Sequence, residues 1–319
     1  MRVRIPFASV GVIYGGASSE REISVRSGRA VAEALRRSNL NIEEIDSHGE
    51  FARELAGRSF DAVFIVLHGR GGEDGEVQEV LEALHVPYTG SGPGPSRLAF
   101  HKDLSKGVFK RGHIPTPCYA VCRPGGAAIG MEVRGPWVVK PTAEGSSIGV
   151  NLVDDFESLQ RMVRMRCAEG ETLLVEERII GRELTVGIVG DEALPVIELK
   201  TSRPFYDYTA KYTPGFTQYL LPADLSGTLT RTVQALALDV FRALELRGFA
   251  RVDLMLDAQE RPYVLEANSI PGFTSSSLLP KAAAYAGRNF DALCLEILAR
   301  ARLEEKPAHR TNPLTASKR

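Results

Sequence analysis

Cysteine is scarce in this sequence, and its distribution argues against a disulfide-rich protein. The chain has four cysteines among 319 residues, at positions 118, 122, 167 and 294. They are too few and too scattered for a disulfide scaffold, which favours a reducing, cytoplasmic environment. Cys118 and Cys122 could form a metal pair, but without a second pair, buried thiols are the commoner outcome for such residues.

Long apolar runs and a surplus of one charge are also absent. No run reaches the roughly 20 apolar residues of a membrane-spanning helix, and the first residues lack a signal-peptide cleavage pattern. The 39 lysines and arginines nearly balance the 40 aspartates and glutamates. No overall basic field therefore exists to hold nucleic acid or an anionic membrane surface, and we expect neither as a partner. The 44% apolar content is enough for two or three packed lobes.

Apolar runs rich in β-branched residues alternate with segments of helical spacing in the first part of the chain. Strands are expected at 8–14, 41–45 and 62–67, and helices at 20–37 and 77–84. This order predicts a parallel α/β lobe. Glycines follow the first and third strands, at the positions where open α/β sheets place their ligands.

The rest of the chain mixes further strands with helices. We expect a helix from about Arg97, a polar aromatic loop over 202–218, a long helix over 225–246 and two closing helices. Strands are expected at 119–122, 137–140, 173–176, 183–189, 193–199, 250–256 and 262–267. Composition places boundaries between lobes at Gly94 to Arg97 and near Gly181. The sequence therefore predicts several α/β lobes rather than one.

Two neighbouring predicted strands near the end of the chain, RVDLMLD and YVLEANSIPG, carry polar side chains at alternate positions. Period-2 spacing places Arg251 and Asp253 on one face of the first strand. If the strands form a hairpin, Asp253 converges with Glu266 and Asn268 as hard oxygen ligands, which suit magnesium carrying nucleotide phosphates. Surface turn carboxylates are the alternative, but unpaired polar groups inside apolar strands would be costly.

The segment KPTAEGSSIGV has a loop rich in glycine and serine after Lys140. Such a loop can fold backbone amides over phosphates, and Lys140 and Lys102 would add positive charge. Taken alone, such a loop is more often a plain hairpin. A lone lysine is more often part of a solvated surface. In LLVEERIIGREL, Glu176 and Glu183 stand where carboxylates could hold an adenine amino group and ribose hydroxyls, although spacing alone favours a charged hinge.

In order and spacing these segments resemble the D-alanine–D-alanine ligases, from about Val10 to about Leu303. The motifs that carry the resemblance are GGASSEREIS, LHGRGGEDG, PYTGSG, VVKPTAEGSSIGV, FYDYTAKY, RVDLMLD and LEANSIPGFTSSSLLPK. The resemblance implies an α/β protein with an ATP-grasp fold and ATP held between its last two lobes. Its expected parts are a Rossmann-like N-terminal lobe over 1–95, a central lobe over 96–180, a C-terminal lobe over 181–305 and a disordered tail over 306–319.

The resemblance also implies roles for single residues on the nucleotide side. The nucleotide contacts it implies are Lys102, Lys140, Glu176, Glu183 and, on a closing loop, Lys211. The ligands it implies for two magnesium ions, or manganese in their place, are Asp253, Glu266 and Asn268. Glu177 stands where many relatives have lysine, and its negative charge near the adenine pocket puts the nucleotide affinity in doubt.

On the substrate side, Glu20 resembles the group that holds the ammonium of the first D-alanine, linked through Ser146 to Tyr212. His68 resembles a group beside the same alanine. Ser277 and the amide of Leu278 resemble the groups that bind the carboxylate of the second alanine. Arg251 and the amide of Gly272 resemble the groups that stabilise the tetrahedral oxyanion. Together these assignments imply two amino-acid subsites beside the nucleotide.

Each of these assignments has a structural alternative. Glu20 could be a helix-start carboxylate beside a capping box of Ser19 and Glu22, and the serines of 275–277 could cap a helix. A lone histidine after a strand is more often structural, and Tyr212 could pack as a lid. The motifs together, rather than any single residue, carry the functional interpretation.

The reaction implied by the resemblance has two steps. ATP phosphorylates the carboxylate of one D-alanine, and the amine of the second attacks the acyl phosphate, which gives the dipeptide of bacterial cell-wall precursors. The rivals are a ligase that takes D-lactate or D-serine as second substrate, of which Tyr212 argues against the lactate form, and another ATP-grasp carboxylate–amine ligase. A nucleotide-gated binding module is the alternative outside enzymes. We also expect a homodimer that binds small molecules.

Overall fold

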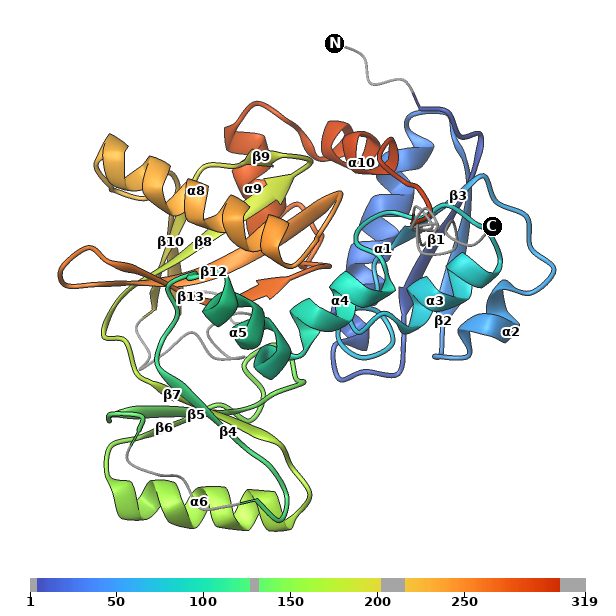
Figure 1. The fold of residues 1–319 in the computed structure, drawn as a ribbon. Coiled ribbons are helices and arrows are strands. Elements are labelled where there is room, and N and C mark those ends of the chain that lie inside the picture. The colour runs from blue at the N-terminus through green and yellow to red at the C-terminus, as the bar shows by residue number, and fades with distance from the viewer. Residues whose placement is uncertain (1–4, 127–131, 202–215, 305–319) are drawn as a thin grey trace, which may run out of the picture.

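The computed structural model of the protein describes residues 5–126, 132–201 and 216–304. Its strands form three sheets, with helices packed beside them (Figure 1). The predicted tail over 306–319 and the predicted site residues Lys211 and Tyr212 lie outside the described residues. The same holds for most of the polar aromatic loop expected over 202–218.

The first sheet is parallel, as the alternation of strands and helices predicted. Strand β1 (Ser9–Gly15) lies between β2 (Asn41–Ser47) and β3 (Ala62–Ile65). The central strand is buried on both faces apart from its first residue, which is typical of parallel sheets covered by helices. The helices that follow these strands are α1 (Arg21–Arg36), α2 (Phe51–Leu55) and α3 (Glu76–Ala83). Of these, the short helix α2 was not expected.

The second sheet is antiparallel and has the strand order β4-β7-β5-β6. Its strands are β4 (Tyr119–Cys122), β5 (Trp137–Pro141), β6 (Asn151–Val153) and β7 (Leu173–Glu177). Helix α6 (Phe156–Ala168) covers one face of it (Figure 1). The sequence analysis placed no helix there, although Asp155 is a good N-cap and its carboxylate accepts a hydrogen bond from the Ser158 amide at 2.8 Å.

The third sheet has the order β11-β10-β8-β12-β13, with β9 paired to β8. Its strands are β8 (Gly181–Val189), β9 (Glu192–Ala193), β10 (Ile197–Thr201), β11 (Thr217–Leu220), β12 (Phe249–Asp257) and β13 (Pro262–Asn268). Helix α8 (Gly227–Ala243) packs against it. At the start of β8, a Cβ on Gly181 would lie 1.9 Å from the carbonyl oxygen of Leu256. Only glycine allows β8 to begin this close to β12.

The helix expected from Arg97 is two helices, α4 (Pro93–Phe100) and α5 (Lys102–Arg111), separated at His101 by an extended ψ of 101°. Both pack in one core with the third sheet. At the end of the chain, α9 (Leu278–Tyr285) and α10 (Phe290–Leu298) join the core of the first sheet. The lobe limits expected at 95 and 180 stay a prediction.

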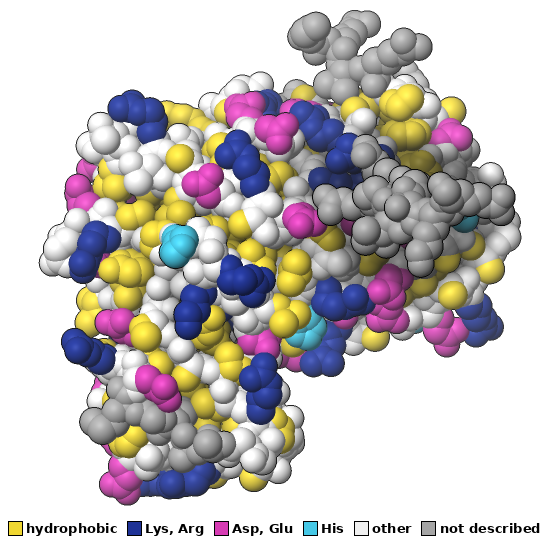
Figure 2. Space-filling view, viewed as in Figure 1, with side chains coloured by type: hydrophobic (Ala, Val, Ile, Leu, Met, Phe, Trp, Pro, Cys, Tyr) yellow, Lys and Arg dark blue, Asp and Glu magenta, His cyan; other side chains and the backbone are white. Residues whose placement is uncertain are grey.

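The surface agrees with the balanced composition. On the face shown in Figure 2, lysines and arginines are interspersed with aspartates and glutamates, without a patch of one sign. No helix in the described ranges combines the length and the apolar character needed to cross a membrane. All four cysteines are free; Cys122 and Cys294 are buried, as expected of buried thiols, whereas Cys118 is exposed.

One aromatic side chain joins the first sheet, the third sheet and the last helix. Phe273 is 1% exposed, and its ring lies 5.7–5.8 Å from the ring centroids of Phe64, Phe249 and Phe290. These neighbours belong to β3, β12 and α10, which are far apart in the sequence. Phe273 therefore ties the N-terminal lobe to the C-terminal sheet.

Replacement of Phe273 by alanine should lower the free energy of unfolding by about 3–5 kcal/mol, because it removes a buried ring and leaves a cavity. Urea denaturation followed by circular dichroism measures this. The control is Leu104→Ala on α5, where the side chain is 43% exposed and the expected loss is within about 0.5 kcal/mol. Equal losses in the two variants would contradict the central position of Phe273.

Candidate active site

Two cavities lie side by side and share a wall. The first, of about 440 Å³, is bordered by the start of α1, the loops after β3 and β13, and the loop before β6. The second, of about 590 Å³, lies between the second and third sheets. Lys102, Arg251 and Glu266 line both. Every predicted site residue within the described ranges lines one cavity or both.

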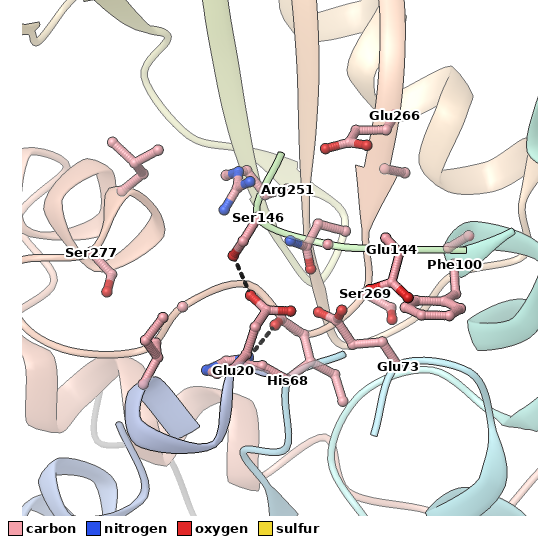
Figure 3. Close-up of a pocket in the computed structure, with 18 of the residues that line it drawn as sticks. Glu20, His68, Glu73, Phe100, Glu144, Ser146, Arg251, Glu266, Ser269 and Ser277 are labelled. Carbon is pink, nitrogen blue, oxygen red and sulfur yellow. Dashed lines mark hydrogen bonds between the residues drawn. The ribbon is translucent and has the colours of Figure 1, made fainter. Parts of the chain in front are cut away.

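Glu20 and Ser146 meet in the smaller cavity. Glu20 occupies the N-cap position of α1 and is 9% exposed, and the hydroxyl of Ser146 donates a hydrogen bond to its Oε1 (Figure 3). A Cβ on Gly145 would lie 2.6 Å from Oε2 of Glu20, so a larger residue at this position would displace the carboxylate of Glu20. No side chain caps this helix, so the alternative of a capping box by Ser19 and Glu22 is wrong.

His68 follows β3 and faces the same cavity. It is 4% exposed, and its Nδ1 lies 2.9 Å from the carbonyl oxygen of Ile270. Burial lowers the pKa of His68 below its usual value, and the charge of Glu20 opposes this shift. A neutral ring that donates from Nδ1 leaves Nε2 as an acceptor. Within the described residues, this buried Nε2 has no hydrogen-bond partner, so it is available to a molecule in the cavity.

The two strands that carry the predicted metal ligands form a hairpin, as expected. Strands β12 and β13 are antiparallel, with Arg251 opposite Asn268 and Asp253 opposite Glu266. The guanidinium of Arg251 donates to both carboxylate oxygens of Asp253, at 2.9 and 2.8 Å. The hydroxyl of Thr185 donates to the same carboxylate at 2.6 Å. Asp253 is thus held from β8 as well as from its own strand.

The other two predicted metal ligands lie next to this pair. The carboxylate of Glu266 lies 3.2 Å from Nζ of Lys102, and Nζ also donates to the carbonyl oxygen of Glu144 at 2.7 Å. The side-chain oxygen of Asn268 is buried and has no hydrogen-bond partner among the described residues. No group of three or more histidine, cysteine, aspartate or glutamate side chains within the described ranges is placed to hold a metal. The predicted ligand set falls outside these four residue types, because Asn268 would contribute an amide oxygen.

The larger cavity holds the predicted nucleotide residues. Lys140 on β5 and Glu176 on β7 form a buried ion pair. Glu183 on β8 lines the same cavity from the third sheet. Glu177, where relatives often have lysine, also lines this cavity. The smaller cavity is bordered by Gly272 and by the first turn of α9, which begins at Leu278. A helix N-terminus of this kind attracts anions such as a carboxylate.

Ser277 occupies the N-cap position of α9, but its side chain does not cap the helix. Its hydroxyl accepts a hydrogen bond from the Thr274 amide at 3.1 Å and shares a hydrogen bond with the Thr274 hydroxyl at 2.9 Å. The alternative of a serine side-chain cap is therefore wrong for Ser277. Ser277 lines the smaller cavity.

Comparisons with known proteins agree with this arrangement. The C-terminal family model of the D-ala D-ala ligases matches residues 125–299, and the N-terminal model matches 43–91. A D-alanine–D-alanine ligase of Alkalilimnicola ehrlichii is 47% identical over 93% of this chain and 95% of its own. The corresponding enzyme of Syntrophotalea carbinolica is 44% identical over 93% of this chain and 97% of its own. The chain belongs to the D-alanine–D-alanine ligase family.

Solved structures of this ligase family have the same fold. The D-alanine–D-alanine ligase of Bacillus anthracis is 32% identical and superposes with a TM-score of 0.82 over 91% of this chain and 96% of its own. Its complex with ATP gives a TM-score of 0.81, with 30% identity over the same shares. The predictions of family, of an ATP-grasp α/β fold and of an ATP-dependent ligase are therefore confirmed. The roles of single residues remain predictions.

Glu73, which was not predicted from the sequence, is a further carboxylate in the smaller cavity of this ligase fold (Figure 3). Glu73 is 8% exposed, and its Oε2 accepts a hydrogen bond from the Gly69 amide at 3.1 Å. Burial, together with the charge of Glu20, raises the pKa of Glu73 well above its usual value. Burial therefore favours the protonated form of Glu73 in the folded protein more than in the unfolded chain. Its position within LHGRGGEDG, a motif already singled out, was the available signal.

The raised pKa of Glu73 makes the folding stability depend on pH. The folded protein keeps a proton on Glu73 that the unfolded chain releases above the ordinary carboxyl pKa, so wild type loses stability as the pH rises. Glu73→Gln removes this proton linkage. The Tm of the variant relative to wild type should therefore be higher at pH 8 than at pH 5, as measured by differential scanning calorimetry.

The control for this measurement is Glu22→Gln, an exposed glutamate in the first turn of α1. Its Tm difference from wild type should be the same at both pH values. If the Glu73→Gln difference is also independent of pH, Glu73 is ionised in the folded protein.

Proposed function

We propose that the protein joins two molecules of D-alanine at the expense of ATP, through a D-alanyl phosphate, and so makes the dipeptide for peptidoglycan precursors. The observation that carries this proposal is the wall of Lys102, Arg251 and Glu266 between the two cavities. One cavity suits a small zwitterion and the other a nucleotide. Family membership supports the proposal, because the curated relatives are D-alanine–D-alanine ligases.

The first step takes place at the shared wall. A free carboxylate is a poor electrophile, and transfer of the γ-phosphoryl group from ATP turns it into an acyl phosphate. In this proposal Glu20, oriented by Ser146, holds the ammonium of the first alanine, and neutral His68 accepts a hydrogen bond beside it. Lys102 and Lys140 lower the repulsion between the phosphates and the incoming carboxylate. Positioning and electrostatic stabilisation, rather than covalent participation of the protein, then account for the rate.

Asp253, Glu266 and Asn268 fit the requirements of bound magnesium. Carboxylate and amide oxygens are the ligands that this ion prefers, and the buried Asn268 oxygen without a partner suits a ligand atom. When bound, magnesium or manganese neutralises charge on the phosphates. Arg251 and Lys102 pair with Asp253 and Glu266 here, and they would be able to contact substrate and phosphate if these carboxylates held the ion.

The second step joins the two alanines. Ser277 and the Leu278 amide hold the carboxylate of the second alanine at the N-terminus of α9. Its amine attacks the acyl phosphate, a C–N bond forms, the C–O bond to phosphate breaks, and the amine loses a proton. Arg251 and the Gly272 amide stabilise the oxyanion of the intermediate. Lys211 and Tyr212, which lie outside the described residues, remain proposed members of this site. We also propose a cytoplasmic homodimer.

A coupled assay of ADP release tests the proposed function directly. ADP should form with ATP, magnesium and D-alanine, and mass spectrometry should detect D-alanyl-D-alanine. D-Serine or D-lactate as second substrate should give little product. ATP turnover with no dependence on D-alanine, or nucleotide binding without turnover, would refute the proposal. A depsipeptide as main product would instead assign the enzyme to the D-lactate branch.

Glu266→Gln tests the metal assignment. The variant keeps the shape of the side chain but loses charge beside the transferring phosphoryl group, so turnover should fall at least about a hundredfold. The control Glu157→Gln changes an 83% exposed glutamate on α6 and should leave turnover unchanged. Near-normal ADP release by folded Glu266→Gln would refute the metal role of Glu266.

A further inference from the structure

A buried cluster of two lysines and one glutamate lies behind the larger cavity. Lys106 on α5 is fully buried, Glu176 on β7 is 2% exposed, and Lys140 on β5 is nearly as enclosed. The ammonium of Lys106 contacts Oε1 of Glu176, and that of Lys140 contacts Oε2. Both oxygens of one carboxylate are therefore held by cations from two different elements.

The remaining contacts of Lys106 leave its ammonium little freedom. Nζ donates to the hydroxyl oxygen of Thr116 and to the carbonyl oxygen of Val264, the latter at 3.2 Å. Thr116 donates to the same carbonyl at 2.7 Å, and the Val264 amide donates to the carbonyl oxygen of Pro115. Lys106 thus connects α5, the segment before β4, strand β13 and Glu176. Two hydrogen bonds and the ion pair with Glu176 thus surround the ammonium.

The charges in this cluster depend on one another. Burial lowers the pKa of Lys106 to about 8, and Lys140 adds to the shift while Glu176 opposes it. Burial alone would raise the pKa of Glu176, but the two ammonium groups outweigh it and hold that pKa below its usual value. Near pH 7 both lysines and the glutamate are therefore charged. A buried carboxylate that loses one of two cations is poorly compensated.

The three residues differ in their access to the cavity. Lys140 and Glu176 line the larger cavity, whereas Lys106 lines neither. Lys106 cannot touch a nucleotide there, and its effect must pass through Glu176. Held at one oxygen by Lys106, the carboxylate presents the other oxygen to Lys140 in a fixed direction. Lys106, which lies outside the cavity, therefore orients the two residues that line it, Glu176 and Lys140.

We propose that Lys106 is a positioning residue of the nucleotide site, which holds Glu176 and, through it, the ammonium of Lys140 in the geometry that binds ATP. The inference rests on the proposed function in one respect, namely that the larger cavity is the nucleotide site. It adds a residue to which the family resemblance assigned no role. Lys106 differs from Lys102, one helical turn earlier, because Lys102 itself lines both cavities.

The test compares Lys106→Met with wild type. Methionine has a long side chain without charge, so Glu176 loses one of its two cations while most of the volume is kept. The dissociation constant of ADP with magnesium, from isothermal titration calorimetry, should rise at least about tenfold, as should the KM for ATP. The KM for D-alanine should change less than about threefold, because the smaller cavity does not contain this cluster.

Lys110→Met is the matched control, because Lys110 is exposed on the next turn of the same helix. Its affinity for ADP should equal that of wild type. A purely structural role for Lys106 would lower Tm and leave the ADP affinity of the folded fraction unchanged. Folded Lys106→Met with wild-type affinity for ADP would therefore overturn the inference.

A double-mutant cycle with Glu176→Gln keeps the inference testable if Lys106→Met does not fold. The double variant has no uncompensated carboxylate and is expected to fold. Because Lys106 acts through Glu176, the double variant should bind ADP no more weakly than Glu176→Gln alone. A further fall of tenfold, or an affinity restored to that of wild type, would contradict this. If wild type itself binds neither ADP nor ATP, the proposed nucleotide site is wrong and this inference falls with it.

Discussion

The pairing of β12 with its two neighbours is the constraint on which the site depends. Asp253 lies opposite Glu266 on β13 and opposite Thr185 on β8. Side chains alternate between the faces of a strand, so a slip of one residue would turn the polar set away from the cavities. The apolar residues that alternate with Arg251 and Asp253, Val252 and Leu254, are fully buried. Core packing of one face thus fixes the chemistry of the other.

Paired charges are the second organising feature. Arg251 binds Asp253, Lys102 lies beside Glu266, and Glu176 lies between two lysines. Several of these groups are largely buried, and buried charges are tolerated where they are paired. The arrangement places cations next to anions at the shared wall of the two cavities and behind the larger cavity. Such a wall can bind phosphate and metal by rearranging pairs that already exist.

The loop after β13 brings distant parts of the smaller cavity's lining together. Its carbonyl at Ile270 lies against His68, and the Phe273 amide donates to the hydroxyl of Ser27 at 3.3 Å. The Phe273 ring then anchors the loop in a core shared by the first and third sheets. Gly272 and Ser277 of this loop line the same cavity as Glu20.

Local patterns in the sequence were enough for most strands, for the parallel first sheet and for the polar residues of the hairpin formed by β12 and β13. Alternation of apolar and polar residues has a physical cause in burial, and it can be read without a structure, as in RVDLMLD. The short helix α2 and the longer α6 were missed, and the extended backbone at His101 split one expected helix into two. Motif resemblance supplied the ATP-grasp fold and the individual roles.

Tertiary structure alone decided how these residues pair. The pKa of Glu73 is raised because the side chain is buried near Glu20, and Lys106 joins Glu176 because the fold brings its ammonium to β13 and β7. Neither relation leaves a local trace, since a pKa and an ion pair depend on burial and on neighbours far away in the chain. The sequence by itself determined which chemical groups are available. The packing of three sheets determined which of them meet, which keep their charge and which face the two cavities, because desolvation and contact exist only in the folded chain.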